Sequence, residues 1–255
     1  MKKLIWLTDL HLVEPGRDWP QGCDPLERLR GCLEEIKALH SDAERIVVSG
    51  DLIQQRNAGA YSLLRAELEQ MPTPFRLSVG NHDDRDALLE TFPQIERVDG
   101  FLQGADDLDG ARLLYLDTLA AAGKHHGELC PVRMRWISDQ ILSADARPLL
   151  IFQHHPPCDI GVPALDRLRL LDSDGLARLV RCRSGPTHLF CGHVHRNVSG
   201  LWAGHPFAAL KSPHVQFGLD MTGAKLVRSE EPPGYGVILV SENEIVVNYR
   251  DLPVS

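Results

Sequence analysis

Short apolar runs alternate with amphipathic stretches over the first three quarters of the 255-residue chain. The apolar runs predict strands at residues 2–8, 45–50, 74–79, 111–117, 148–153 and 187–192. The stretches between them place apolar residues at helical spacing and predict helices at residues 24–40, 60–71, 84–92, 133–143 and 173–182. This order is typical of βα units in which helices cover the faces of a sheet.

The pattern changes in the last quarter of the chain, where strands follow one another without helices. Residues 197–204, 205–210, 214–219, 234–240 and 243–250 predict strands joined by tight turns, and therefore antiparallel hairpins. We find no internal repeat, low-complexity tract or linker between the two parts. We therefore expect one domain over residues 1–255, with the chemistry-bearing motifs at residues 9–195 and hairpins from about residue 197.

Composition narrows the class of protein. The chain is 43% hydrophobic and carries a net charge of -8, which argues against nonspecific binding to a nucleic acid polymer or an anionic membrane. No apolar run approaches the roughly eighteen residues of a membrane span, and the N-terminal residues do not resemble a signal peptide. Six cysteines at irregular spacing indicate reduced thiols, so we expect a cytoplasmic protein.

Polar side chains follow five of the predicted strands at the point where each strand ends. They are Asp9 and His11, then Asp51, Asn81 and His82, His154 and His155, and finally His193 and His195. In open α/β sheets the crevice beyond the carboxyl ends of the strands binds ligands. Residues i and i+2 point the same way on an extended chain, so Asp9 with His11, and His193 with His195, are each expected to send two side chains into one crevice.

The side chains in this set offer oxygen and imidazole nitrogen and no thiolate, which suits Mn, Fe, Zn or Mg. Taken singly, an aspartate after a strand is more often a turn residue or a helix cap than a metal ligand. Two histidines at positions i and i+2, as in "GHVH", have little structural purpose of their own. This motif is therefore better evidence for a metal site than a single aspartate. The combination of all five strand ends therefore predicts a metal site.

The ordered motifs "DLH" (9–11), "GD" (50–51), "GNHD" (80–83), "HH" (154–155) and "GHVH" (192–195) resemble those of the calcineurin-like metallophosphoesterases. The resemblance spans residue 3 to about residue 200. "GNHDDR", "HHGEL" at 125–129 and "HHPP" look most like class III cyclic nucleotide phosphodiesterases and bacterial glycerophosphodiesterases. The resemblance implies an α/β fold, a four-layer αββα sandwich of two mixed sheets, with a dinuclear metal site at the C-terminal ends of the strands.

The resemblance also implies roles for individual residues. It assigns one cation to Asp9, His11 and His195, and the other to Asn81, His154 and His193, with Asp51 bridging the two. It places His82 over the substrate, as a group that stabilises a phosphoryl oxygen or protonates the leaving alcohol. Asn81 and His126 are further candidates for substrate contact, and His155 is expected to support its loop.

The implied cofactors are two divalent ions, Mn or Fe before Zn, Mg or Co. Two such ions, two aspartates and a bridging hydroxide leave about one positive charge to attract an anionic phosphate. The implied function is hydrolysis of a small phosphodiester, of the cyclic nucleotide or glycerophosphodiester type, by in-line attack of that hydroxide. Alternatives are a phospholipase C-like phosphodiesterase, a phosphomonoesterase and, more remotely, a non-catalytic scaffold; a homo-oligomer is compatible with each. The apolar stretch at 159–172 is expected either to line a lipid-sized pocket or to be ordinary core.

Overall fold

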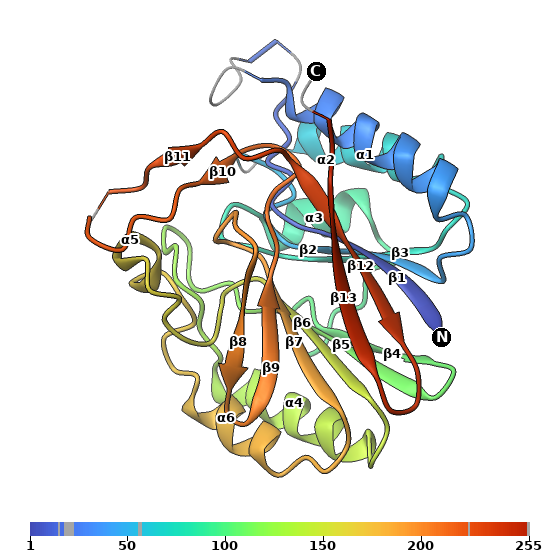
Figure 1. Cartoon of the computed structure of the whole chain (residues 1–255), viewed down its shortest axis with the longest axis vertical. Helices are drawn as coiled ribbons and strands as arrows, with labels where there is room; N and C mark the ends of the chain where they lie inside the picture. Colours follow the sequence, from blue (N-terminus) through green and yellow to red (C-terminus); the bar gives the residue numbers. More distant parts are fainter. Residues whose placement is uncertain (15, 18–22, 56–57, 224, 254–255) are drawn as a thin grey trace.

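A computed structural model describes residues 1–14, 16–17, 23–55, 58–223 and 225–253. Two sheets pack face to face, with helices on their outer faces (Figure 1). The first sheet has the order β13-β12-β1-β2-β3, and the second has the order β4-β5-β6-β7-β9-β8. A short pair, β10 and β11, stands apart from both sheets.

The strands of the first sheet are β1 (Lys2–Leu7), β2 (Arg45–Ser49), β3 (Phe75–Ser78), β12 (Gly234–Val240) and β13 (Ile245–Asp251). Those of the second are β4 (Gly104–Leu108), β5 (Ala111–Leu116), β6 (Leu149–Gln153), β7 (Thr187–Cys191), β8 (Val198–Trp202) and β9 (His205–Ala209). The pair that stands apart is β10 (Gln216–Phe217) and β11 (Arg228–Ser229). The helices are α1 (Pro25–Leu39), α2 (Ala58–Leu68), α3 (Arg85–Thr91), α4 (Pro131–Ser143), α5 (Pro163–Asp166) and α6 (Asp174–Arg181).

The alternation of side chains along β1 explains the layers. Leu4 and Trp6 point into an apolar core between the two sheets, whereas Ile5 and Leu7 pack with α1, α2 and α3. In the inter-sheet core the ring of Trp6 meets that of Phe190 edge to face at 5.2 Å. A third core lies between the second sheet and helices α4 and α6. The four-layer αββα arrangement that the resemblance implied is thus confirmed.

Parallel strands bring the loops that follow them to one edge of each sheet. In the first sheet β1, β2 and β3 are parallel, and in the second β5, β6, β7 and β9 are parallel. The loops after β1, β2, β3, β6 and β7 carry the polar residues predicted from the strand ends. The fold therefore gathers them where the two sheets meet.

Two antiparallel pairs of the last quarter join the main sheets, whereas β10 and β11 do not. Strands β8 and β9 pair antiparallel, and β9 also lies parallel to β7 in the second sheet. The hairpin of β12 and β13 extends the first sheet through antiparallel pairing with β1. Three elements were not predicted: β4, whose sequence "GADDL" lacks an apolar run, the four-residue helix α5, and the two-residue strand β11.

Candidate metal centre

The seven predicted metal ligands are buried together at the junction of the two sheets. Their exposed fractions range from 0% for Asp9 and His154 to 7% for His193. Ligand atoms of Asp9, His11 and His195 lie within 4.8 Å of one another, as do those of Asp9, Asp51 and His154. The strand ends therefore converge as the sequence predicts.

The backbone route to this convergence differs from the extended one we expected. Asp9, His11, Asp51, His193 and His195 have φ between 47° and 72°, in the left-handed region. Only eight non-glycine residues of the described chain have positive φ, and five of them are predicted ligands. Such conformations are strained for residues with a Cβ and concentrate at functional sites. The loops turn their side chains inward through left-handed residues and not through extended alternation.

The first group of donors is centred on His11 and His195. Their Nε2 atoms lie 3.0 Å apart, and Asp9 Oδ1 lies 3.4 Å from His195 Nε2. His195 donates its Nδ1 hydrogen to the carbonyl oxygen of Val215 at 2.7 Å, which directs its Nε2 atom into the group. Burial lowers the pKa of His11 to about 3, so this ring is neutral and offers a nitrogen lone pair to a metal ion.

The second group is marked by buried polar atoms that have no hydrogen-bond partner. They are Asn81 Oδ1, His154 Nε2 and His193 Nε2. His154 donates its Nδ1 hydrogen to the carbonyl oxygen of Ser49 at 3.1 Å, and Asn81 donates from Nδ2 to His125 Nδ1 at 3.2 Å. The Asn81 and His154 side chains are thus each held by one polar atom while the other is left free. Buried polar atoms are otherwise nearly always paired, so these three fit a cation that they would coordinate.

Asp51 lies between the two groups. Its Oδ2 is 3.6 Å from His11 Nε2 and 3.3 Å from His154 Nε2, while its Oδ1 accepts the backbone N–H of His82 at 2.9 Å. Burial opposes ionisation of this carboxyl, but His154 and His82, in their protonated forms, hold its pKa well below the ordinary value. An ionised carboxylate that reaches both groups fits the bridging position.

His82 occupies a turn directly after Asn81, and both side chains line the same cavity. Neighbours on an extended strand would face opposite sides, but β3 ends at Ser78 and residues 81 and 82 form a turn. His82 donates its Nδ1 hydrogen to the carbonyl oxygen of Gln54 at 2.8 Å, and its ring meets that of His11 edge to face at 4.8 Å.

The loop that carries His125 and His126 approaches the cavity through the first of these residues. His125 lines the cavity, whereas His126 pairs with Glu128 at 2.9 Å and is not among the lining residues. His155 joins its own loop to this one: its Nε2 donates to the carbonyl oxygen of His125, and its Nδ1 accepts from Thr118 Oγ1. Both ring nitrogens of His155 are therefore engaged, which leaves His154 as the free donor of the pair.

Asp83 has a supporting role that the sequence did not indicate. The neighbouring Asp84 caps α3, where it accepts from the N–H groups of Asp86 and Ala87. Asp83 is instead fully buried and accepts hydrogen bonds from the Leu52 N–H, the Gly80 N–H and the Tyr61 hydroxyl. It thereby joins the loop of Asp51 to the loop of Asn81. Arg85 is not among the residues that line the cavity and forms a bidentate ion pair with Asp117.

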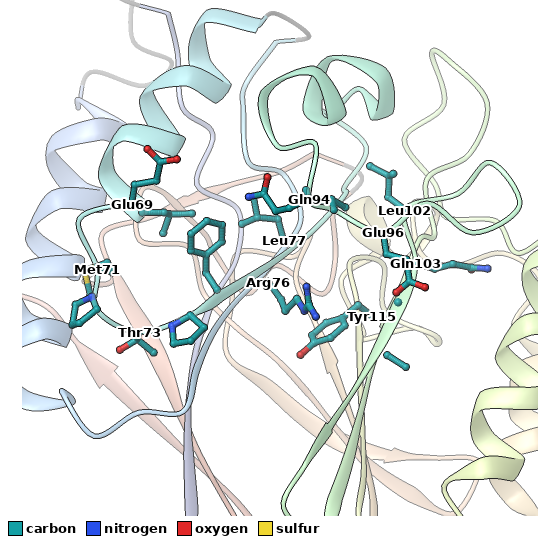
Figure 2. A pocket seen from close by; sticks show the side chains of 17 residues that line it. Glu69, Met71, Thr73, Arg76, Leu77, Gln94, Glu96, Leu102, Gln103 and Tyr115 are labelled. Atoms are coloured by element: carbon teal, nitrogen blue, oxygen red, sulfur yellow. The ribbon is translucent and has the colours of Figure 1, made fainter.

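Two cavities need to be distinguished. The cavity beside the predicted ligands has a volume of about 260 Å³ and contains His11, Asp51, Asn81, His82 and His193 in its lining. A larger cavity of about 400 Å³ lies beside β3 and the start of β4, and contains none of the predicted site residues (Figure 2). Gln103 contributes to its lining, but the amide end points away from it. The chemistry-bearing side chains therefore place the candidate site at the smaller cavity.

Comparison with known proteins gives concordant results. A model of the calcineurin-like phosphoesterase family matches residues 2–197. The chain is 37% identical to a probable cyclic nucleotide phosphodiesterase from Rhodopseudomonas palustris, over 96% of this chain and 91% of that protein. It is 27% identical to a probable glycerophosphodiester phosphodiesterase from Arcobacter nitrofigilis, over 90% of this chain and 85% of that protein.

A dimetal phosphatase from Danio rerio shares the fold, with a TM-score of 0.73 at 14% identity over 98% of this chain and 96% of that one. A purple acid phosphatase from yellow lupin shares it with a TM-score of 0.69 at 12% identity, over 98% of this chain and 51% of that one. The order of the motifs, the four layers and the extent of the family match lead to one conclusion: the chain belongs to the calcineurin-like phosphoesterase family.

Proposed function

We propose that this protein is a dinuclear-metal-dependent phosphodiesterase that hydrolyses a small phosphodiester of the cyclic nucleotide or glycerophosphodiester type. The observation that carries the proposal is the second donor group, in which three buried polar atoms lack partners beside the shared carboxylate of Asp51. The names of two relatives, a cyclic nucleotide phosphodiesterase and a glycerophosphodiester phosphodiesterase, support the substrate class.

The donors divide between two cations as the motifs suggest. Asp9, His11 and His195 would hold one ion, Asn81, His154 and His193 the other, and Asp51 would contact both. Bound there, two divalent ions would polarise the phosphoryl oxygens and lower the pKa of water. Nitrogen and carboxylate donors suit Mn or Fe, with Zn, Mg and Co as alternatives. The neutral amide of Asn81 adds a donor without cancelling positive charge.

His82 would act on the substrate and not on a metal. Its Nδ1 is held by the Gln54 carbonyl oxygen, so Nε2 is the atom available to the cavity. From there it would stabilise a phosphoryl oxygen or deliver a proton to the leaving alcohol, which is worth roughly 100- to 10,000-fold in rate. Asn81 would also contact substrate, and His125 is better placed than His126 for the contact we assigned to that loop.

The charge of the cavity favours a diester over a monoester. Among the described residues that line it there is no Lys or Arg. A dianionic monoester would thus find no cationic side chain, whereas a diester carries a single negative charge that the metal centre would balance. A non-catalytic scaffold is disfavoured because every candidate ligand and His82 is present and buried or half-buried at one place.

A substrate panel tests the proposal. Enzyme reconstituted with Mn²⁺ is assayed on bis-p-nitrophenyl phosphate, p-nitrophenyl phosphate, cyclic AMP, glycerophosphocholine and a phospholipid, with Asp51→Ala as the metal-site control. We expect turnover of diesters and almost none by Asp51→Ala. Much faster turnover of the monoester than of every diester would contradict the proposal.

The cellular setting is also proposed. None of the described helices is long and apolar enough to span a bilayer. All six cysteines are free thiols, which supports the reducing cytoplasm as the location. A homo-oligomer is compatible with the fold, and light scattering would measure it.

A further inference from the structure

One side of the candidate cavity is an apolar wall. Leu165 and Leu168 contribute to it from α5 and the turn after it, and Val215, Phe217 and Leu226 from the segment that contains β10 and β11. Outside the candidate ligands, His82 and His125, only Gln54 and His214 are polar among the described lining residues. A substrate group on this side would meet hydrocarbon and few hydrogen-bonding partners.

The wall continues outward onto the surface of the hairpin. Leu219 and Met221 are each 62% exposed, Val227 is 48% exposed and Leu226 is 44% exposed. These are four of the twelve large apolar side chains that the described chain exposes, and they fall within nine residues. We call Phe217, Leu219, Met221, Leu226 and Val227 the apolar strip. Figure 1 shows the hairpin of β10 and β11 projecting from the body of the protein beside α5.

Contacts from two sides fix the strip relative to the metal centre. The candidate ligand His195 donates to the carbonyl oxygen of Val215, and Phe217 donates its N–H to the carbonyl oxygen of His195 at 3.3 Å. The Phe217 ring lies 4.6 Å from the His195 ring. At the hairpin tip, a methyl group on Gly161 would lie 3.0 Å from Met221 Cε, so Met221 lies against the backbone that leads into α5.

We propose that the substrate is an amphiphilic phosphodiester, with one ester group that carries a hydrocarbon chain, as in a lysophospholipid. This rests on the proposed phosphodiesterase function and specifies its substrate. The phosphate lies at the donor groups, and the chain lies along the apolar strip toward solvent. Each methylene removed from water favours binding. A second copy of the protein would cover only the outer part of the strip, whereas a chain anchored at the phosphate covers the wall inside the cavity as well.

Alkyl p-nitrophenyl phosphates test the inference, with methyl, butyl and octyl groups below their micelle-forming concentrations and Mn²⁺ present. We expect kcat/KM to rise about two- to fourfold per methylene along the part of the chain that contacts the strip. A flat series would overturn the inference and leave the phosphodiesterase proposal standing. Failure of every diester, the methyl ester included, would overturn both.

A variant pair locates the effect. Leu226→Ser replaces a residue that lines the cavity and is partly exposed, and it should lower the ratio of octyl to methyl kcat/KM by about tenfold. The control, Leu201→Ser on β8, changes a leucine that is 77% exposed and should leave the ratio unchanged. An equal effect of both variants would overturn the inference. So would an unchanged ratio together with a dimer-to-monomer shift of Leu226→Ser by light scattering, which would make the strip an interface between copies.

Discussion

His82 donates its Nδ1 hydrogen to the carbonyl oxygen of Gln54 at 2.8 Å, so its Nε2 is the ring atom left for the cavity. The neighbouring Asn81 instead leaves a buried amide oxygen without a partner. We predict that His82→Ala keeps both metals but lowers kcat/KM for diesters with alkyl leaving groups by roughly 100- to 10,000-fold. The loss should be smaller for nitrophenyl esters, whose leaving group needs little protonation.

Metal content, measured by inductively coupled plasma mass spectrometry, separates this role from that of Asn81. Asn81→Ala should lose metal, because it removes a donor from the second group. If His82→Ala also lost metal, the roles assigned to the two residues would have to be merged.

His125 and His126 form a matched pair for testing which histidine of their loop serves the site. His125 accepts a hydrogen bond from Asn81 Nδ2 and thereby orients the amide, whereas His126 contacts Glu128. One such hydrogen bond is worth about 0.5–1.5 kcal/mol, so His125→Ala should lower kcat/KM about three- to tenfold. His126→Ala should change it less than twofold, and the opposite ranking would return the role to His126.

The motifs allowed the candidate ligands to be predicted because they are tied to strand ends. Asp9, His11, Asp51, His193 and His195 follow apolar runs that are easy to find, and parallel pairing brings such ends together. Their left-handed backbone was not predictable, since a positive φ in a residue with a Cβ is a property of the surrounding loops.

Supporting residues were harder to predict because their partners are distant in sequence. Asp83 resembles a helix-capping residue until the fold places Leu52 N–H and Tyr61 hydroxyl against it. The strand β4 escaped prediction for another reason: Asp106 and Asp107 interrupt its apolar pattern. In the fold the Asp106 carboxylate is paired by Arg76 on β3, Arg45 on β2 and the Tyr115 hydroxyl on β5, all distant in sequence or on another strand.

Asp83 is predicted to be a positioning residue for both halves of the centre. Asp83→Ala removes the acceptor that joins the Leu52 and Gly80 backbones, and so loosens Asp51 and Asn81. Mutation of a residue that hydrogen-bonds to a metal ligand or orients it typically lowers metal affinity about 10- to 100-fold. We expect a loss of about that size for Asp83→Ala. Titration of metal-free protein with Mn²⁺ by calorimetry measures it.

The control for this loss is Asp84→Ala, which removes the N-cap side chain of α3 but keeps the backbone hydrogen bonds of residue 84 to the Tyr61 hydroxyl. It should cost about 1 kcal/mol in the free energy of unfolding and leave metal affinity unchanged. Equal losses of affinity in both variants would show that Asp83 acts through general stability.

Gly80 is predicted to be irreplaceable because of its neighbours. A Cβ at this position would lie 2.3 Å from Asp51 Oδ1 and 2.5 Å from Asp51 N, inside van der Waals contact. Gly80→Ala should therefore displace the shared carboxylate and lower activity more than about 100-fold, because the group that orients the reaction would move.

The control is Gly31, inside α1, which has open space around it. Gly31→Ala should retain full activity and stabilise the protein by about 0.5–1 kcal/mol, as measured by urea unfolding.

Metal binding is predicted to stabilise the folded chain, because the donors converge only in the native state. Free Mn²⁺ at 100 times its dissociation constant should add about 2.7 kcal/mol per site to the free energy of unfolding. For a chain of this length that corresponds to a rise in Tm of roughly 5–10 °C per site, measurable by differential scanning calorimetry. Chelator should reverse the rise. Asp51→Ala, which removes the carboxylate that reaches both groups, should abolish most of it, whereas His205→Ala on β9 should not. A full rise in Asp51→Ala would place the bound metal somewhere other than between the two donor groups.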